Sequence, residues 1–125
     1  MAQTKVLLSM DTSWQAWIGE ILAMDNHIAI EATSETPESL AEQFVAEQAD
    51  VLFIEPGAPS RNLEWFRKIY EAMSGQPIVI CSASYDGWLD FCSSNNLAVV
   101  VVNMWDRDPK HSFKEEIEKA RGLVT

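Results

Sequence analysis

Five short apolar runs alternate with five segments of helical periodicity, and this alternation is the feature that most constrains the fold. The runs are KVLL at 5–8, HIAIEA at 27–32, VLFI at 51–54, PIVIC at 77–81 and AVVVV at 98–102. The third and fourth runs are apolar throughout, which is typical of strands covered on both faces of a parallel sheet. Repeated strand–helix units with short connections predict a parallel sheet with helices on both faces.

The same patterns predict where strands lie in the sheet and where helices begin and end. Ile28, Ile30 and Ala32 alternate with other residues as in a half-covered edge strand, whereas the β-branched run at 98–102 favours a central or well-covered position. Helices are predicted over 12–22, 37–49, 62–73, 88–94 and 113–122. Their expected start signals are Thr12 with Gln15, Thr36 with Pro37, and Ser112 with Glu115, and the expected end signals are Gly75 and Asn95 with Asn96.

Length and charge limit the number of domains and the kinds of partner. A chain of 125 residues without a linker or repeat is expected to form one domain, residues 1–125. Its 19 acidic and 9 basic residues give a formal net charge of −10, so nucleic acid is not expected as a ligand. No segment is long and apolar enough for a membrane span, and Cys81 and Cys92 lack metal-binding spacing. We therefore expect a cytoplasmic protein without a structural metal or a membrane contact.

Polar side chains follow the predicted strands, at the edge where parallel α/β sheets bind their ligands. The candidate residues are Ser9, Met10 and Asp11 after the first run, Glu55 after the third, Ser82 and Ser84 after the fourth, and Asn103 after the fifth. All of them except Met10 are polar. A small-molecule-binding domain is one function that such an edge could serve. The sequence SMDTSW after the first run has no glycine-rich phosphate loop, which counts against that function.

With these strand ends, the chain resembles the receiver domain of two-component response regulators over nearly its whole length. The resemblance implies a flavodoxin-like α/β fold, a doubly wound five-stranded parallel sheet of order 2-1-3-4-5 with helices on both faces. In that family an aspartate at the end of the third strand accepts a phosphoryl group, and Glu55 stands at this position. The family's acid pair, which holds Mg²⁺, falls on Met10 and Asp11.

The family's switch residues are matched only in part. Ser82 and Ala83 match the hydroxyl residue that contacts the phosphoryl group and the small residue after it. Asn103 stands where the family has a lysine, and Val100 stands where it has the switch aromatic. The resemblance therefore implies the family's topology without its complete catalytic set.

Three of these departures argue against aspartyl-phosphate chemistry. A thioether at Met10 is a poor ligand for Mg²⁺, Asn103 removes a positive charge, and Glu55 carries its carboxylate one methylene too far for an in-line attack. We therefore predict a pseudo-receiver: a signalling module, not an enzyme, that works without phosphorylation and without a cofactor. The alternative is a divergent but active phosphoacceptor that uses Asp11 or Glu55 with a divalent cation.

The sequence leaves three interpretations of Glu55. Its carboxylate could only hydrate the end of the strand. It could supply a fixed charge where a phosphoryl group would sit, drawing Ser82 inward through a hydrogen bond. It could also share weak metal binding with Asp11.

Two tryptophans are candidates for an interaction surface. Trp88 begins the predicted fourth helix and Trp105 follows the fifth strand, on the side that receivers use for partners. Exposed aromatic residues there would mark an interface, whereas ordinary packing is the other interpretation. The acidic composition suggests a protein partner with a basic patch, and a homodimer through the fourth helix, fifth strand and fifth helix is a further prediction.

Overall fold

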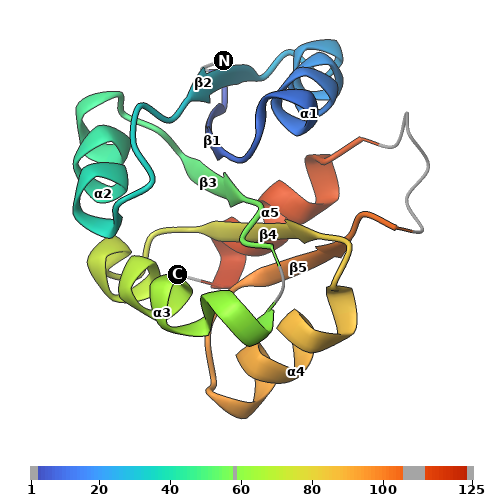
Figure 1. The fold of residues 1–125 in the computed structure, drawn as a ribbon. Coiled ribbons are helices and arrows are strands. Elements are labelled where there is room, and N and C mark those ends of the chain that lie inside the picture. Colours follow the sequence, from blue (N-terminus) through green and yellow to red (C-terminus); the bar gives the residue numbers. More distant parts are fainter. Residues whose placement is uncertain (1–2, 58, 106–111, 124–125) are drawn as a thin grey trace.

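The computed structural model contains one five-stranded parallel sheet with helices on both faces (Figure 1). It describes residues 3–57, 59–105 and 112–123, except for the side chains of 59–61. The strand order is β2-β1-β3-β4-β5, so the predicted flavodoxin-like order 2-1-3-4-5 is confirmed. The elements are β1 (Lys5–Ser9), α1 (Thr12–Met24), β2 (Ile28–Glu31), α2 (Pro37–Ala46), β3 (Val51–Ile54), α3 (Pro59–Met73), β4 (Ile78–Ser82), α4 (Tyr85–Ser94), β5 (Val100–Asn103) and α5 (Lys114–Leu123).

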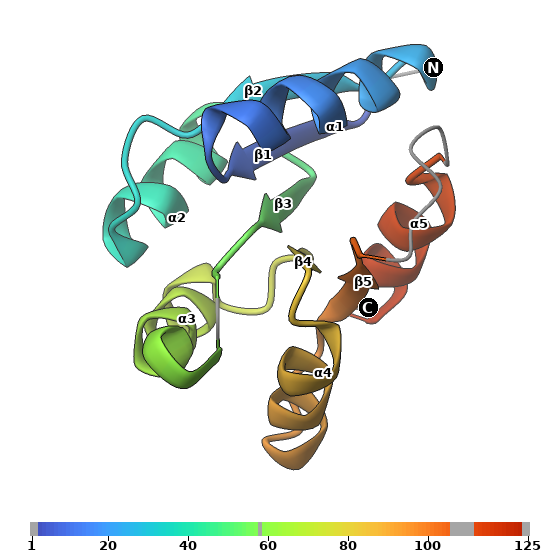
Figure 2. The same cartoon turned by 45° about the vertical axis from the view of Figure 1, so that its right-hand side comes forward.

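The sheet separates two apolar layers. Helices α1 and α5 pack on one face, where Phe53 meets Phe113 edge to face with ring centroids 5.2 Å apart. Helices α2, α3 and α4 pack on the other face, and Figure 2 shows these three helices together on one side of the sheet. None of the helices in the described part of the chain is both long enough and apolar enough to cross a membrane.

The central strands are covered on both faces, as their unbroken apolar runs predict. Every residue of β3 and β4 is buried, including Ser82 at the end of β4 and Cys81 before it. Because side chains alternate along a strand, Leu52 and Ile54 enter one layer while Val51 and Phe53 enter the other. These two strands fix the positions of the polar residues that follow them.

The two edge strands differ in how well the sequence predicts them. Strand β2 alternates between half-buried and exposed residues and lies at an edge, as expected. The valine run was predicted to be central or well covered: it is not central, because β5 is the other edge strand, but its valines pack into the apolar layers on both faces of the sheet. Val100 and Val102 are buried against α1 and α5, whereas Val101 is only half-buried. The β-branched run therefore reflects the packing of its faces and not a central place in the sheet.

Helix starts follow local capping, with small shifts from the predictions. Thr36 caps α2 and accepts a hydrogen bond from the Ser39 amide, with Pro37 at the first helical position, as predicted. Helix α1 is capped by Asp11 and not by Thr12, because the Asp11 carboxylate accepts from the Trp14 amide. Helices α3 and α4 begin at Pro59 and Tyr85, earlier than the apolar periodicity indicates.

The first four helices end in the left-handed backbone conformation. Residues with positive φ follow each of them: Asn26, Gln48, Ser74 with Gly75, and Asn96. Gly75, at φ +85°, fits the predicted end of α3, and Asn96 fits the predicted end of α4. These reversals return the chain to the start of each next strand.

The Thr36 cap gives a test of the local argument. Replacing Thr36 by Ala should lower the free energy of unfolding by about 1 kcal/mol, because the Ser39 amide loses its acceptor. Thr36→Ser should retain most of the stability, since serine keeps the oxygen. Urea denaturation of the three proteins measures the difference, and equal stability of all three would show that the cap contributes nothing.

Candidate functional site

The carboxyl ends of β1, β3, β4 and β5 form one polar edge of the sheet. The parallel register places Ser9 beside Ile54 and Ser82 beside Asn103. Backbone hydrogen bonds continue past the strand ends, with the Glu55 amide donating to the Ser9 carbonyl oxygen and the Met104 amide donating to the Ser82 carbonyl oxygen, both at 3.0 Å. The predicted strand-end residues thus lie along one edge, as the topology requires.

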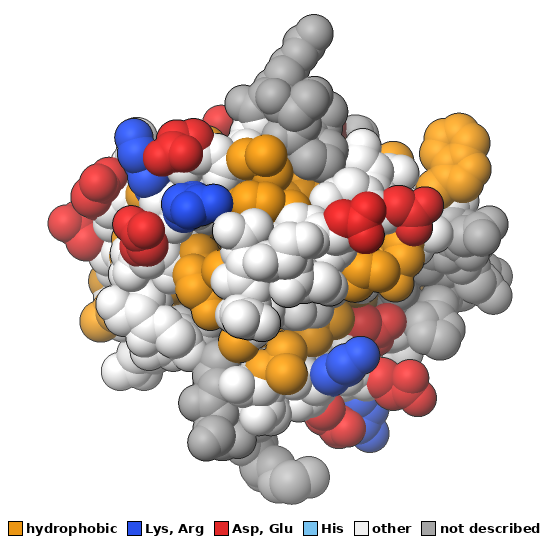
Figure 3. Space-filling view, turned by 90° about the horizontal axis from the view of Figure 1, so that it is seen from below, with side chains coloured by type: hydrophobic (Ala, Val, Ile, Leu, Met, Phe, Trp, Pro, Cys, Tyr) orange, Lys and Arg blue, Asp and Glu red, His pale blue; other side chains and the backbone are white. Residues whose placement is uncertain are grey.

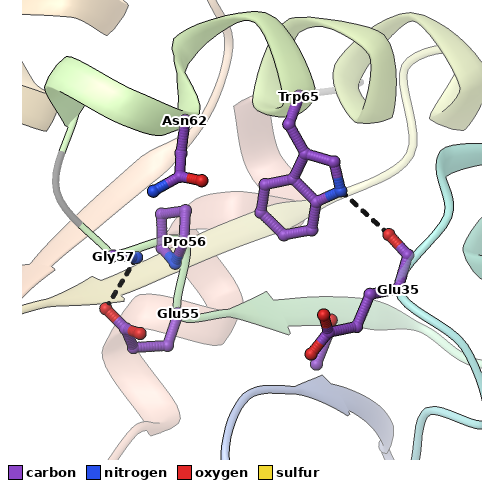
Figure 4. A pocket seen from close by; sticks show the side chains of 7 residues that line it. Glu35, Glu55, Pro56, Gly57, Asn62 and Trp65 are labelled. Atoms are coloured by element: carbon purple, nitrogen blue, oxygen red, sulfur yellow. Dashed lines mark hydrogen bonds between the residues drawn. The ribbon is translucent and has the colours of Figure 1, made fainter.

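Glu55 turns its carboxylate back onto its own loop. Its Oε1 accepts a hydrogen bond from the Gly57 amide at 3.0 Å, as Figure 4 shows. Gly57 has φ +76°, and a Cβ there would lie 3.1 Å from the Asn62 side-chain nitrogen, so glycine suits this turn. Burial raises the pKa of the Glu55 carboxyl, and the negative charge of Asp11 raises it further, while the hydrogen bond from Gly57 opposes both effects. The carboxylate is therefore half-buried and held by the loop.

The two residues at the family's acid-pair position have structural roles. Asp11 is exposed, and its pKa is lowered because Ser13 Oγ donates to its carboxylate at 2.7 Å and the Trp14 amide donates at 3.2 Å. Met10 is only 7% exposed and packs in the layer of α1 and α5. The expected vestigial acidic pocket therefore contains one acid that caps a helix and one core side chain. Within the described ranges, no three His, Cys, Asp or Glu side chains gather closely enough to hold a metal ion.

The switch-equivalent residues also bond locally. Ser82 Oγ accepts from the Ser84 amide at 3.0 Å, and Asn103 Oδ1 accepts from the Trp105 amide at 3.1 Å. The hydrogen bond expected between Ser82 and Glu55 is not among those of the described residues, so the interpretation that Glu55 draws Ser82 inward is not supported. Ala83 lies next to this turn, and Val100 is a buried core residue.

The two candidate interface tryptophans have opposite environments. Trp88 is fully buried, so of its two interpretations the structure supports ordinary packing and not an exposed interface residue. Its ring packs edge to face against Phe66 and Phe91, and its Nε1 donates to the Gly57 carbonyl oxygen at 2.7 Å. The reason is that α4 begins at Tyr85, which turns Trp88 toward α3 and the loop after β3. Trp105 is 82% exposed, and its role at an interface stays a prediction.

Two pockets lined by described residues lie along this edge, and sequence patterns missed most of their lining. One, of about 410 Å³, is lined by Ser9, Glu35, Glu55, Pro56, Gly57, Asn62 and Trp65 (Figure 4). The other, of about 260 Å³, is lined by Ala83, Ser84, Tyr85, Asp86, Gly87, Asn103 and Trp105. Trp65 is half-buried and directly precedes the buried Phe66 on α3, and an aromatic residue beside a buried position of a helix was the available signal for a side chain at the rim of a pocket.

The fold and this edge define the class as a flavodoxin-like α/β domain. No protein-family model and no curated protein sequence matches the chain. Among solved structures, it is similar to a candidate pilus assembly-related protein from Burkholderia pseudomallei, with a TM-score of 0.67 and 12% sequence identity. The match covers 98% of this chain and 92% of that protein, and at this identity it shows a shared fold.

The raised pKa of Glu55 predicts a pH-dependent effect of Glu55→Gln. The folded protein binds the Glu55 proton more tightly than the unfolded chain, so ionisation of Glu55 destabilises the fold as pH rises through the folded pKa. Glutamine keeps an oxygen for Gly57 and removes this penalty. The stability of the variant relative to the native protein should therefore increase as pH rises from the ordinary carboxyl pKa through the raised pKa of the folded protein.

Urea denaturation at a series of pH values measures this difference. Glu64→Gln is the matched control, because Glu64 is exposed on α3 and does not line the pocket. The difference between Glu55→Gln and the native protein should change with pH more than that of Glu64→Gln does, and equal pH dependence of the two would contradict the burial argument.

The buried indole of Trp88 gives a second prediction. Trp88→Phe keeps an aromatic ring but removes the donor to the Gly57 carbonyl oxygen, so we expect a loss of about 1–3 kcal/mol in the free energy of unfolding. Trp105→Phe, at the exposed tryptophan, should change it by less than about 0.5 kcal/mol. Chemical denaturation of both variants distinguishes the two sites, and equal effects would contradict the anchoring role of Trp88.

Proposed function

We propose that the protein is a receiver-like signalling module that works through protein–protein interaction and not through phosphorylation. The observation that carries the proposal is the conformation of Glu55. The side chain at the phosphoacceptor position is bonded to the Gly57 amide of its own loop. One of its two carboxylate oxygens is therefore engaged by the loop, which counts against its use as the nucleophile toward a phosphodonor.

The residues at this edge do not fit the Mg²⁺ ion of the receiver family. Mg²⁺ requires hard oxygen ligands in near-octahedral geometry, and the Met10 thioether packs in the core instead. Asp11 caps α1 with its carboxylate, and the neutral Asn103 amide bonds the Trp105 backbone. We therefore assign no metal, no cofactor and no catalytic step to these residues.

A protein partner is the binding function that we propose for the face around α4. This helix carries Asp86 and Asp90, and the exposed Trp105 follows the neighbouring strand β5. Figure 3 shows acidic side chains next to hydrophobic ones on the face seen from the side of α4. With a net charge of −10, the protein suits a partner that has a basic patch, and a second copy of the chain is the other candidate on this face. The similar protein from B. pseudomallei is described as related to pilus assembly, which is compatible with a module that binds other proteins.

A phosphorylation assay tests the proposal. Incubation with acetyl phosphate and Mg²⁺ should leave the intact mass unchanged, and beryllofluoride should leave the amide NMR shifts of β5 unchanged. Glu55→Asp is the matched variant, because it restores the family's acceptor while Met10 and Asn103 stay unchanged. It should also remain unlabelled.

Stoichiometric labelling of the native protein that Glu55→Gln or Asp11→Asn abolishes would contradict the proposal. That result would establish the divergent phosphoacceptor instead. Labelling of Glu55→Asp alone would show that the rest of the site is competent and that only the length of the side chain prevents the reaction.

A further inference from the structure

The pocket of about 410 Å³ beside Glu55 has features of a binding site that the proposed function does not use. It opens between the ends of β1 and β3, the loop before α2 and the first turns of α3. Its lining combines two carboxylates, an indole, an amide and a serine hydroxyl. The volume is large enough for a side-chain-sized ligand.

The indole wall is held in a fixed orientation. Trp65 Nε1 donates to the backbone carbonyl oxygen of Glu35 at 2.9 Å, so the helix α3 and the loop before α2 are joined across the pocket. Figure 4 shows the carboxylates of Glu35 and Glu55 on the side of the pocket opposite Asn62, with the Trp65 ring between Glu35 and Asn62. The indole and the two acidic residues thus line one pocket, in which the Glu55 carboxylate is turned toward the Gly57 amide.

Ser9 adds a polar group to the buried end of the pocket. The residue is only 3% exposed, and it belongs to the lining of the pocket. Alternation along β1 places Ser9 on the same face as Leu7, which packs with α2 and α3, so its side chain lies on the pocket's side of the sheet. Its hydroxyl is a group with which a ligand in the pocket can form a hydrogen bond.

The charges of the pocket select the class of ligand. The two carboxylates disfavour an anion, and the described residues include no ion pair that neutralises either of them. Desolvation raises the pKa of the Glu55 carboxyl, and a bound cation would lower it again by stabilising the carboxylate. An aromatic face attracts ammonium and guanidinium groups, whereas a divalent metal would need more converging oxygen ligands than the described residues supply here.

We propose that this pocket binds an organic cation, an alkylammonium or guanidinium group, between the carboxylates of Glu35 and Glu55 and against the ring of Trp65. Ser9 and the Asn62 amide lie within the same lining and can contact the remainder of the ligand. The cation can belong to a free amine or to a lysine or arginine side chain of another protein. The inference concerns this pocket alone, so it can fail while the proposed function of the α4 face stands.

NMR titration of the full chain tests the proposal, with the Trp65 indole N–H as the reporter. The probes are agmatine as a free cation and Nα-acetyl-lysine methylamide as a side-chain analogue, with Nα-acetyl-norleucine methylamide as the neutral control. Saturable shifts at Trp65 with either cation, and none with the neutral compound, are expected. Tighter binding of agmatine favours a free amine, and tighter binding of the lysine analogue favours a protein side chain.

Charge-removing variants locate the site. Glu35→Gln and Glu55→Gln should each weaken binding about fivefold to tenfold, because each removes one of two charge-assisted contacts. Glu64→Gln, on the same helix as Trp65 but outside the lining, should bind as the native protein does. Unchanged amide spectra elsewhere confirm that the variants fold. Absence of saturable shifts, equal binding of the neutral compound, or unchanged affinity in both pocket variants would overturn the proposal.

Discussion

The complete burial of β3 and β4 is the constraint on which the rest of the structure depends. Strands without a solvent-facing side need a helical layer on each face, and the two layers of helices supply it. Burial also keeps charged side chains out of these strands, so Glu55 follows β3 at its end, where water or a ligand can reach it. Together with Ser9, Ser82 and Asn103 at the ends of the neighbouring strands, it forms the polar edge.

A short chain of contacts joins this edge to α4. The Glu55 carboxylate accepts from the Gly57 amide, and the Gly57 carbonyl oxygen accepts from the buried indole of Trp88. Gly57 thus bonds Glu55 at the sheet edge through its amide and Trp88 of α4 through its carbonyl oxygen. The loop after β3 and the start of α4 are therefore positioned together, and the pocket beside Glu55 shares one wall with this arrangement.

The sequence predicts the topology well because hydrophobic periodicity reports burial directly. The runs at 51–54 and 77–81, the edge strand at β2 and the Thr36 cap follow from side-chain type and spacing alone. Side-chain direction at the site was harder to predict. For Trp88 the sequence left both an interface and ordinary packing open, because the register of a short helix decides which side chains face inward and α4 begins three residues before the predicted start.

The site also depends on rotamers and on neighbours distant in the chain. No local pattern shows that Glu55 folds back onto Gly57, or that Trp65 reaches the backbone of Glu35 across 30 positions in sequence. The burial of Met10 is a further feature that the local sequence does not predict, since a methionine after a strand is compatible with an exposed loop position and with a core position. Its burial depends on the layer formed by α1 and α5, which the residues around it do not specify.

The unequal exposure of the five tryptophans also gives the protein a built-in optical label. Trp88 is sealed in the core and three others are half-buried, whereas Trp105 stands in solvent at the end of β5. Its fluorescence should be the red-shifted component and the one most accessible to a neutral quencher such as acrylamide; iodide would be partly repelled by the net charge of −10. Any molecule that covers this end of the sheet would therefore report its arrival through the emission of one native residue.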